Sequence, residues 1–316
     1  MAQNTELTND IVTTEYKARY DNAAKRILSN KTILAWIMKS CLDEFKDYDI
    51  ETIADKCIEG TPIVSGAAVD RNTADKEIIK GTSADDATIT EGTVYFDIKF
   101  DANTLDDERV NLIINVEAQN DLSPGYPIVK RGLYYGSRLI SAQKGTVFTG
   151  EHYEKIQKVY SIWVLVNTAN YNSDGISKYS VCESILKGNN KQKKEDFDLI
   201  TVYMLYLSNE SGRNSDGIIR LLSVLLSNEV SKEEKLTILE DEFKISPTRD
   251  FEEGVNVMCN LSEGIERKAL EKGIQALVEA FKEINVLEDT IVEKVIEKYG
   301  ISQENAEAAV KKYGKQ

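Results

Sequence analysis

The sequence predicts an α/β fold that is followed by an α-helical extension. Two strand-like segments, residues 93–100 and 110–117, are separated by a short polar turn. A helical pattern at residues 128–142 and another apolar strand at residues 158–166 come next. From Ser215 onward apolar residues recur at three- and four-residue steps. This order of elements is an α/β pattern, with further helices toward the C-terminus.

The composition is that of a folded protein. The chain has 316 residues, of which 41% are hydrophobic and 29% charged, so disorder is not its main state. This length suits one main domain with a smaller appendage. No apolar run approaches the roughly 18–20 residues that a membrane span needs. The polar N-terminus lacks the pattern of a secretion signal, and we therefore expect a cytoplasmic protein.

The chain offers little for zinc binding or histidine-based catalysis. Its cysteines, Cys41, Cys57, Cys182 and Cys259, form no Cys-x-x-Cys pair, and His152 is the only histidine in the sequence. A catalytic triad would have to be built around that one side chain, whose neighbours are typical of a polar loop. We expect the cysteines to be buried, reduced thiols.

The first predicted element is helical. Apolar residues recur with helical spacing between Tyr16 and Lys46, and a break at residues 29–31 predicts two helices or one kinked helix. Residues 60–92 are rich in Gly, Thr, Ser, Asp and Ala and have no sustained period. That stretch fits either several short strands or a long excursion.

The two strands that follow differ in character. Residues 93–100 are rich in aromatic and β-branched side chains. Residues 110–117 form a nearly continuous apolar run, which is typical of a central strand covered on both faces. Because few residues separate them, we expect a hairpin.

The remaining elements alternate before becoming helical. We expect a second helix to begin near Tyr153, a polar basic loop at residues 187–194, and a core strand or helix at residues 197–207. Helices are predicted at residues 232–243 and 249–283, and two short ones between Leu287 and Tyr313 on either side of Gly300, Ile301 and Ser302. Ser302 is a plausible N-cap residue, with Asn305 three positions later.

The two predicted strands bring polar side chains together. Side chains alternate along a strand, so Asp97 and Lys99 share one face of the first strand and Glu117 and Gln119 share one side of the second. A matching register gathers two carboxylates, an amide and an ammonium, and the carboxylates suit Mg²⁺ or Mn²⁺. The alternative is that both carboxylates are simply solvated at a strand edge.

Several segments together resemble the PD-(D/E)XK nuclease family transposases, which are related to bacterial recombination-promoting nucleases. The resemblance covers about residues 16–210 and rests on FDIKF around Asp97, INVEAQND around Glu117, KRGLYYGSRLISAQ, YEKIQKVYSIWVLV and the N-terminal YDNAAKRILSNKTILAWIMK. It implies a restriction-endonuclease-like core, which is a mixed sheet flanked by helices. It also implies Mg²⁺-dependent cleavage of DNA and metal ligation by Asp97 and Glu117.

One position departs from the general signature of that superfamily, which ends in Lys where this chain has Gln119. Glutamine orients a water or a phosphate oxygen but supplies no positive charge. Lys99 could place an ammonium in nearly the same space, and Lys130 and Arg131 are rival sources. A helical carboxylate often completes the site in this superfamily. Asp21 is a candidate, although an N-cap role would also explain it.

The helix at residues 128–142 supplies the predicted substrate-binding residues. Lys130 opens it, and Arg131, Tyr135 and Arg138 recur on one helical face, where they could bind phosphate and support the metal ligands. The alternative is aromatic packing with surface arginines.

The overall charge opposes this interpretation. The net charge of −14 slows the approach to a polyanion, so DNA binding requires a local basic surface. Basic residues do cluster around the proposed site in the sequence, whereas acidic residues dominate the C-terminal third. The basic residues are Lys130, Arg131, Arg138, Lys144, Lys155 and Lys158, with the 187–194 loop beyond.

These observations predict a flexible tail at residues 1–15, a nuclease domain at residues 16–210 and a helical extension at residues 211–316. The expected function is that of a Mg²⁺- or Mn²⁺-dependent DNA endonuclease that is linked to recombination or mobile elements. We expect the protein to bind DNA and not a membrane. The alternative is a catalytically silent DNA-binding or assembly protein that keeps the fold. The C-terminal helices could mediate homo-oligomerisation, or they could simply cap the nuclease domain.

Overall fold

The structure is a computed structural model. It describes residues 19–64, 85–88, 92–95, 97–105, 109–117, 125–166, 168, 174–208, 215–227 and 229–314. The chain divides into two compact units, Met1–Met258 and Cys259–Gln316. The predicted domain boundary between residues 210 and 211 stays a prediction.

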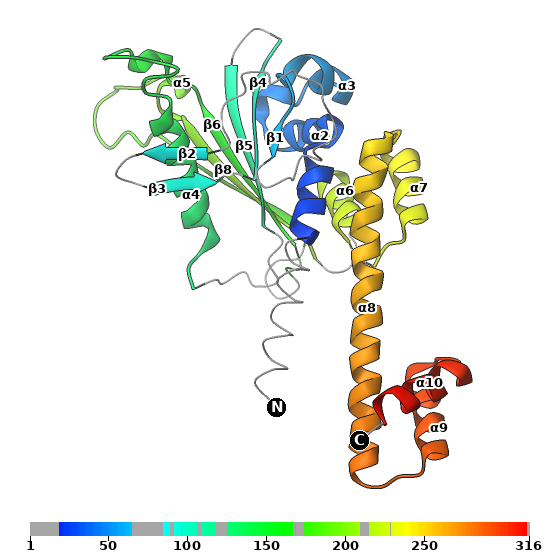
Figure 1. The fold of residues 1–316 in the computed structure, drawn as a ribbon. Coiled ribbons are helices and arrows are strands. Elements are labelled where there is room, and N and C mark those ends of the chain that lie inside the picture. The colour runs from blue at the N-terminus through cyan, green and yellow to red at the C-terminus, as the bar shows by residue number, and fades with distance from the viewer. Residues whose placement is uncertain are drawn as a thin grey trace. The chain divides into compact units, whose positions relative to one another are not determined.

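A six-stranded mixed sheet forms the centre of the first unit (Figure 1). Its strand order is β1-β4-β5-β6-β8-β7. The strands β5, β6 and β8 run parallel, and β1, β4 and β7 are antiparallel to their neighbours. The bounds are β1 Ile63–Val64, β4 Ile98–Asn103, β5 Arg109–Glu117, β6 Val159–Leu165, β7 Gly175–Ser180 and β8 Ile200–Tyr206.

Helical segments cover both faces of this sheet, as the α/β prediction requires. Every residue of β6 is buried, and so is the centre of β8. On one face, α4 (Ile128–Ala142) packs against Trp163 and Val202. On the other face, Tyr160 contacts the 3₁₀ turn η1 (Asp43–Phe45), which follows α2 (Lys31–Cys41). The predicted fold class is therefore confirmed.

Two glycines let α4 approach the sheet closely. A Cβ built on Gly132 would lie 2.8 Å from Val202 and 2.9 Å from Trp163. A Cβ on Gly136 would lie 2.6 Å from Ile200. The absence of side chains at these positions therefore fixes the distance between the helix and the strands.

The N-terminal segment forms two helices, at residues 19–28 and at α2. Asn30 begins α2 as its N-cap, because its side chain accepts hydrogen bonds from the backbone N–H groups of Thr32 and Ile33. The predicted break is thus confirmed. The short helical turns α3 (Ile50–Thr52) and η2 (Ile53–Cys57, a π-helix) then lead to β1.

The prediction of one strand over residues 93–100 is wrong. β3 (Gly92–Tyr95) pairs with β2 (Asp85–Thr88) in a separate two-stranded sheet, and β4 of the main sheet begins only at Ile98. Asp97 forms a bend between them. Aspartate is disfavoured within strands, and the carboxylate of Asp97 is engaged by a side chain from another element.

Two further expectations are settled between α4 and β8. The helix expected near Tyr153 is only the 3₁₀ turn η3 (Tyr153–Lys155). The ambiguous apolar stretch at residues 197–207 contains the end of the short helix α5 (Lys194–Phe197) and the strand β8. The cysteines are free, but only Cys41 and Cys57 are buried as expected.

The helices of the C-terminal part match their predicted positions. The structure has α6 Gly217–Leu226, α7 Lys232–Phe243, α8 Arg249–Glu283, α9 Glu288–Tyr299 and α10 Gln303–Tyr313. Ser302 caps α10 by accepting a hydrogen bond from the backbone N–H of Asn305, as predicted. No helix among the described residues combines the length and the apolar character of a membrane span.

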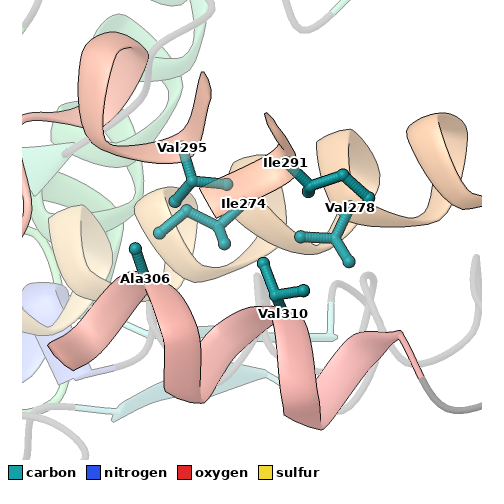
Figure 2. Close-up of a cluster of buried hydrophobic side chains, with 6 residues drawn as sticks. All are labelled: Ile274, Val278, Ile291, Val295, Ala306 and Val310. Carbon is teal, nitrogen blue, oxygen red and sulfur yellow. The ribbon is translucent and has the colours of Figure 1, made fainter. Parts of the chain in front are cut away.

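The second unit has a small apolar core of its own. Side chains from the C-terminal half of α8 and from α9 and α10 meet in Figure 2, and all of them are buried. They are Ile274, Val278, Ile291, Val295, Ala306 and Val310. The amphipathic pattern of the sequence therefore produces a helical cluster here.

Candidate active site

The backbone brings the two predicted metal ligands to the same end of neighbouring strands. Asp97 immediately precedes the first residue of β4, and Glu117 is the last residue of β5. Because β4 and β5 are antiparallel and Ile98 pairs with Ile114, the start of β4 lies beside the end of β5. The predicted hairpin is confirmed. Gln119 lies outside the described residues, and of Glu117 the structure describes the backbone.

The carboxylate of Asp97 forms an ion pair with a lysine from the N-terminal helix. The Nζ atom of Lys25 lies 2.9 Å from Oδ1 of Asp97 and 2.7 Å from Oδ2 of Asp21. The Lys25 side chain is only 10% exposed, whereas those of Asp21 and Asp97 are 36% and 22% exposed. A largely buried ammonium therefore joins two carboxylates that solvent can reach.

Helical spacing places Asp21 and Lys25 together. They are four residues apart, so their side chains meet one turn apart on the same face of the helix at residues 19–28. Ile27 and Leu28 in this helix are fully buried. The hydroxyl of Tyr20 donates a hydrogen bond of 2.7 Å to the backbone oxygen of Leu226. The helix is thus anchored in the core, and Lys25 projects from it onto the start of β4.

The two carboxylates also govern the protonation of Lys25. Burial alone lowers the pKa of this ammonium, because it removes the charge from water. Hydrogen bonds and Coulomb attraction from Asp21 and Asp97 outweigh burial, and the pKa of Lys25 lies above its usual value. The site therefore holds a lasting positive charge at neutral pH.

Lys99 lies inside the sheet on β4. Its backbone pairs with Ile113 of β5 and with Ile63 of β1, and its side chain is partly buried. Lys99 thus lies two residues after Asp97, but Asp97 forms the bend before β4, so the prediction that both residues share one face of a single strand is wrong.

The predicted substrate-binding residues differ in accessibility. Lys130 is exposed near the N-terminus of α4, whereas Arg138 is only 3% exposed. Arg131 donates hydrogen bonds of 2.9 and 3.1 Å to the hydroxyl of Tyr135, and its guanidinium also lies 5.4 Å from the ring centre of Trp163. Arg131 and Tyr135 thus lie on one helical face, as expected, and the structure adds a hydrogen bond and cation–π stacking between them.

Much of the expected basic cluster lies elsewhere: Lys155 comes shortly before β6, and residues 187–194 connect β7 to β8, both at the opposite end of the parallel strands from Glu117. Lys158 precedes β6, at the opposite end of the parallel strands from Glu117. Its Nζ atom lies 2.9 Å from Asp198 and 3.4 Å from Glu44. Lys158 is therefore occupied in a structural network, and sequence proximity overstated its role in the site.

Asp21 and Asp97 are the described carboxylates that could contribute to a divalent-cation site. Asp21 and Asp97 direct carboxylate oxygens at one ammonium nitrogen, so the pair already surrounds a single positive charge. Carboxylate oxygens are hard ligands that suit Mg²⁺ and Mn²⁺. Among the side chains that the structure describes, no group of three or more His, Cys, Asp or Glu residues forms a ligand set. The side chain of Glu117 is not among those described.

Sequence reasoning missed Lys25. It sought the positive charge at Lys99, Lys130 or Arg131, all close in sequence to the carboxylates. One local signal was available, because Lys25 lies four residues after Asp21 and between the apolar positions Ala24 and Leu28. A lysine on the buried side of an amphipathic helix needs a partner of opposite charge. The position of Lys25 therefore predicts a carboxylate partner in the folded protein.

The comparison with protein families agrees with this geometry. Residues 70–209 match the family model described as PD-(D/E)XK nuclease family transposase, as the sequence resemblance predicted. The matched range includes Asp97, β5, α4 and β6, and it begins after the helix that carries Asp21 and Lys25. No curated protein and no solved structure matches the chain.

Proposed function

We propose, from the premise that residues 70–209 belong to the PD-(D/E)XK nuclease family transposases, that this protein is a metal-dependent DNA endonuclease. The observation that carries the proposal is the meeting of β4 and β5, where Asp97 and Glu117 occupy the same end of the sheet. Acidic side chains beside apolar strands are costly unless they are paired or bind a metal. A purely structural role of this end of the sheet would not require two of them.

Asp97 and Glu117 would hold Mg²⁺ or Mn²⁺. A bound ion of this kind lowers the pKa of water and stabilises negative charge on a phosphate. Gln119 would orient the attacking water or a phosphate oxygen by hydrogen bonding, since its amide carries both a donor and an acceptor. Lys99 is a further candidate at the same end of β4, and its ammonium could contact the scissile phosphate.

The N-terminal part of α4 would bind the DNA backbone. Lys130 is exposed and free to reach a phosphate through solvent. Arg131 is fixed by Tyr135 and Trp163, so its planar guanidinium is ordered before substrate arrives. Buried Arg138 would act from below the surface, by supporting the helix on which these groups stand.

The charge of the chain shapes the expected affinity. With a net charge of −14, attraction to DNA has to come from a local surface, and long-range steering is unfavourable. We expect modest affinity with a steep loss as salt increases. A cytoplasmic setting in recombination or mobile-element turnover fits the family, and the C-terminal helices could join two copies of the chain.

Plasmid cleavage tests the proposal. Supercoiled plasmid is incubated with the wild type, Asp97→Ala, Glu117→Ala and the surface control Asp55→Ala, in Mg²⁺, Mn²⁺ or EDTA. We expect nicking by the wild type and by Asp55→Ala only when metal is present. Each site variant should lose on the order of 100-fold in rate. Equal cleavage by all four proteins would identify a contaminant and overturn the proposal.

A second function is favoured by one observation, the glutamine at position 119 in place of the signature lysine. On this alternative the protein binds DNA without cutting it. Retarded migration of a DNA duplex, together with intact plasmid in both metals, would favour the silent binding protein.

A further inference from the structure

The candidate site lacks the lysine that the signature places two residues after its second carboxylate. In this chain that position holds Gln119, which is neutral. Phosphodiester cleavage accumulates negative charge on the phosphate, and a neutral amide offsets less of it than an ammonium does. A positive side chain from another element would restore the balance.

We propose that Lys25, from the helix at residues 19–28, supplies this missing ammonium. The inference rests on the proposed nuclease function and adds a residue to it. Lys25 is a positioning residue, because it holds Asp97 and Asp21 and acts on the reaction through them.

Lys25 is in direct contact with the carboxylate of Asp97. Its Nζ atom lies 2.9 Å from the carboxylate of Asp97, and the same nitrogen lies 2.7 Å from Asp21. An ammonium carries three N–H donors, one more than the two carboxylates require. Two of these donors hold Asp97 and Asp21 in place, so the positive charge of Lys25 stays beside Asp97.

Burial keeps this ammonium in place. The Lys25 side chain is 10% exposed, and the helix that carries it is held by the buried residues Ile27 and Leu28. A lysine on a mobile surface would lose several rotamers on each encounter with substrate. Lys25 has already lost that freedom on folding, so its charge is ordered before DNA arrives.

The carboxylate pair also links Lys25 to metal binding. Asp21 and Asp97 gather around one positive charge, and without the ammonium the two carboxylates would repel each other. A divalent ion can relieve the same repulsion. Removal of Lys25 should therefore increase the stabilisation that added metal gives, in addition to slowing the reaction.

The first experiment measures cleavage under single-turnover conditions in Mn²⁺. It compares the wild type with Lys25→Met, Lys25→Arg, Lys99→Met and the matched control Arg26→Met. Arg26 is the next residue of the same helix and pairs with Glu253 at the surface. We expect Lys25→Met to lose about 100-fold in rate at saturating DNA with little change in the DNA concentration at half-saturation. Lys25→Arg should recover part of that loss, Lys99→Met should lose less than Lys25→Met, and Arg26→Met should match the wild type.

The second experiment needs no activity. Melting temperatures of the wild type, Lys25→Met and Arg26→Met are recorded with Mn²⁺ alone and with EDTA. We expect Mn²⁺ to raise the melting temperature of Lys25→Met more than that of the other two proteins. If Lys25→Met does not fold, Lys25→Gln, which can still donate hydrogen bonds to both carboxylates, replaces it in both assays.

The outcomes separate this inference from the proposed function. If the wild type cuts DNA and Lys25→Met cuts at the same rate, the role of Lys25 is refuted and the nuclease proposal stands. If no protein cuts DNA but Mn²⁺ stabilises Lys25→Met most, the nuclease proposal fails and the placement of Lys25 at a cation site stands. Equal Mn²⁺ stabilisation of all three proteins, with no cutting by any, refutes both.

Discussion

Two lysines in the first unit each join a pair of carboxylates, at opposite ends of the parallel strands. Lys25 joins Asp21 and Asp97 near the end of β5, and Lys158 joins Glu44 and Asp198 before the start of β6. The charges and the distances are similar. The surroundings of the two groups are not.

The group around Lys158 is closed. Asp198 is only 4% exposed, and the hydroxyl of Tyr160 donates to Oε1 and Oε2 of Glu44 at 2.5 and 2.7 Å. These contacts join η1 to the sheet. The carboxylate oxygens of Glu44 and Asp198 therefore already have partners within the protein. Burial and the charge of Glu44 also raise the pKa of Tyr160, so its hydroxyl stays a donor.

The group around Lys25 is open, because solvent reaches both of its carboxylates. It also stands beside the end of β5, where a further acidic residue ends the strand. The comparison teaches that a lysine between two carboxylates does not identify a catalytic site by itself. Accessibility and the neighbouring strand end distinguish the two groups.

The largest expected difference between the two ends is in catalysis. Asp97→Asn should lower the cleavage rate by about 100-fold, because it removes a ligand charge from the open group. Asp198→Asn should leave the rate of the folded protein close to that of the wild type. Initial rates of plasmid nicking, normalised to the folded fraction, measure both. Similar losses in the two variants would show that the open and the closed group do not differ in catalysis.

The closed group should matter more for stability. Lys158→Met leaves the buried carboxylate of Asp198 with Lys194, 3.6 Å away, as its remaining lysine partner. Loss of one partner from a buried ion pair costs about 3 kcal/mol, so urea should unfold this variant at a clearly lower concentration. Exposed Lys155→Met serves as the control and should behave as the wild type. An unchanged midpoint for Lys158→Met would mean that the closed group contributes nothing to folding.

A smaller effect is expected at Tyr160. Tyr160→Phe removes the hydroxyl that donates to both oxygens of Glu44 and should cost about 2 kcal/mol. The measurement is the free energy of unfolding in urea, with and without Mg²⁺. Because this group lies away from the open carboxylates, Mg²⁺ should stabilise the variant and the wild type equally. A Mg²⁺-dependent difference would connect the two ends of the sheet.

The smallest effect concerns acid. Hydrogen bonds from Lys46 and Lys178 lower the pKa of Asp43, in η1, from 3.8 to about 2. Its folded pKa is below its unfolded pKa, so its contribution is present above pH 4 and is lost as the pH falls toward 2. Asp43 is exposed, and the contribution should stay below about 1 kcal/mol.

Denaturation midpoints at pH 5, 3 and 2 test this prediction for Asp43→Asn. Asp47→Asn, at an exposed residue nearby, is the control. The difference between the wild type and Asp43→Asn should shrink as the pH falls. A difference that stays constant over this range would show that the ion pairs of Asp43 do not stabilise the fold.

Local signals predicted much of this fold. Helical spacing predicts the bounds of α7 and α8. Ser302 marks the start of α10 as its N-cap residue, through a hydrogen bond within the same turn. Such features depend on residues three or four positions apart. The sequence therefore contains most of the information that defines them.

Features that depend on distant residues were harder to predict. Most side chains of residues 93–100 favour strands, so the sequence predicts one strand there. In the structure, β3 and β4 instead pair with strands of two different sheets. For the site, the hairpin pattern correctly placed Asp97 and Glu117 at the same end. It could not show Lys25, because that contact depends on how a helix far away in the sequence packs onto the sheet.

The origin of Lys25 in that first helix has a practical consequence. The family similarity starts at residue 70, so a fragment cut to the matched range would leave the helix behind. Such a fragment would retain Asp97 but lose its bridging lysine and the acidic residue opposite. Inactivity of that fragment would therefore reflect the loss of Lys25 and Asp21. Truncated variants of this protein should keep the helix at residues 19–28 and should not begin at residue 70.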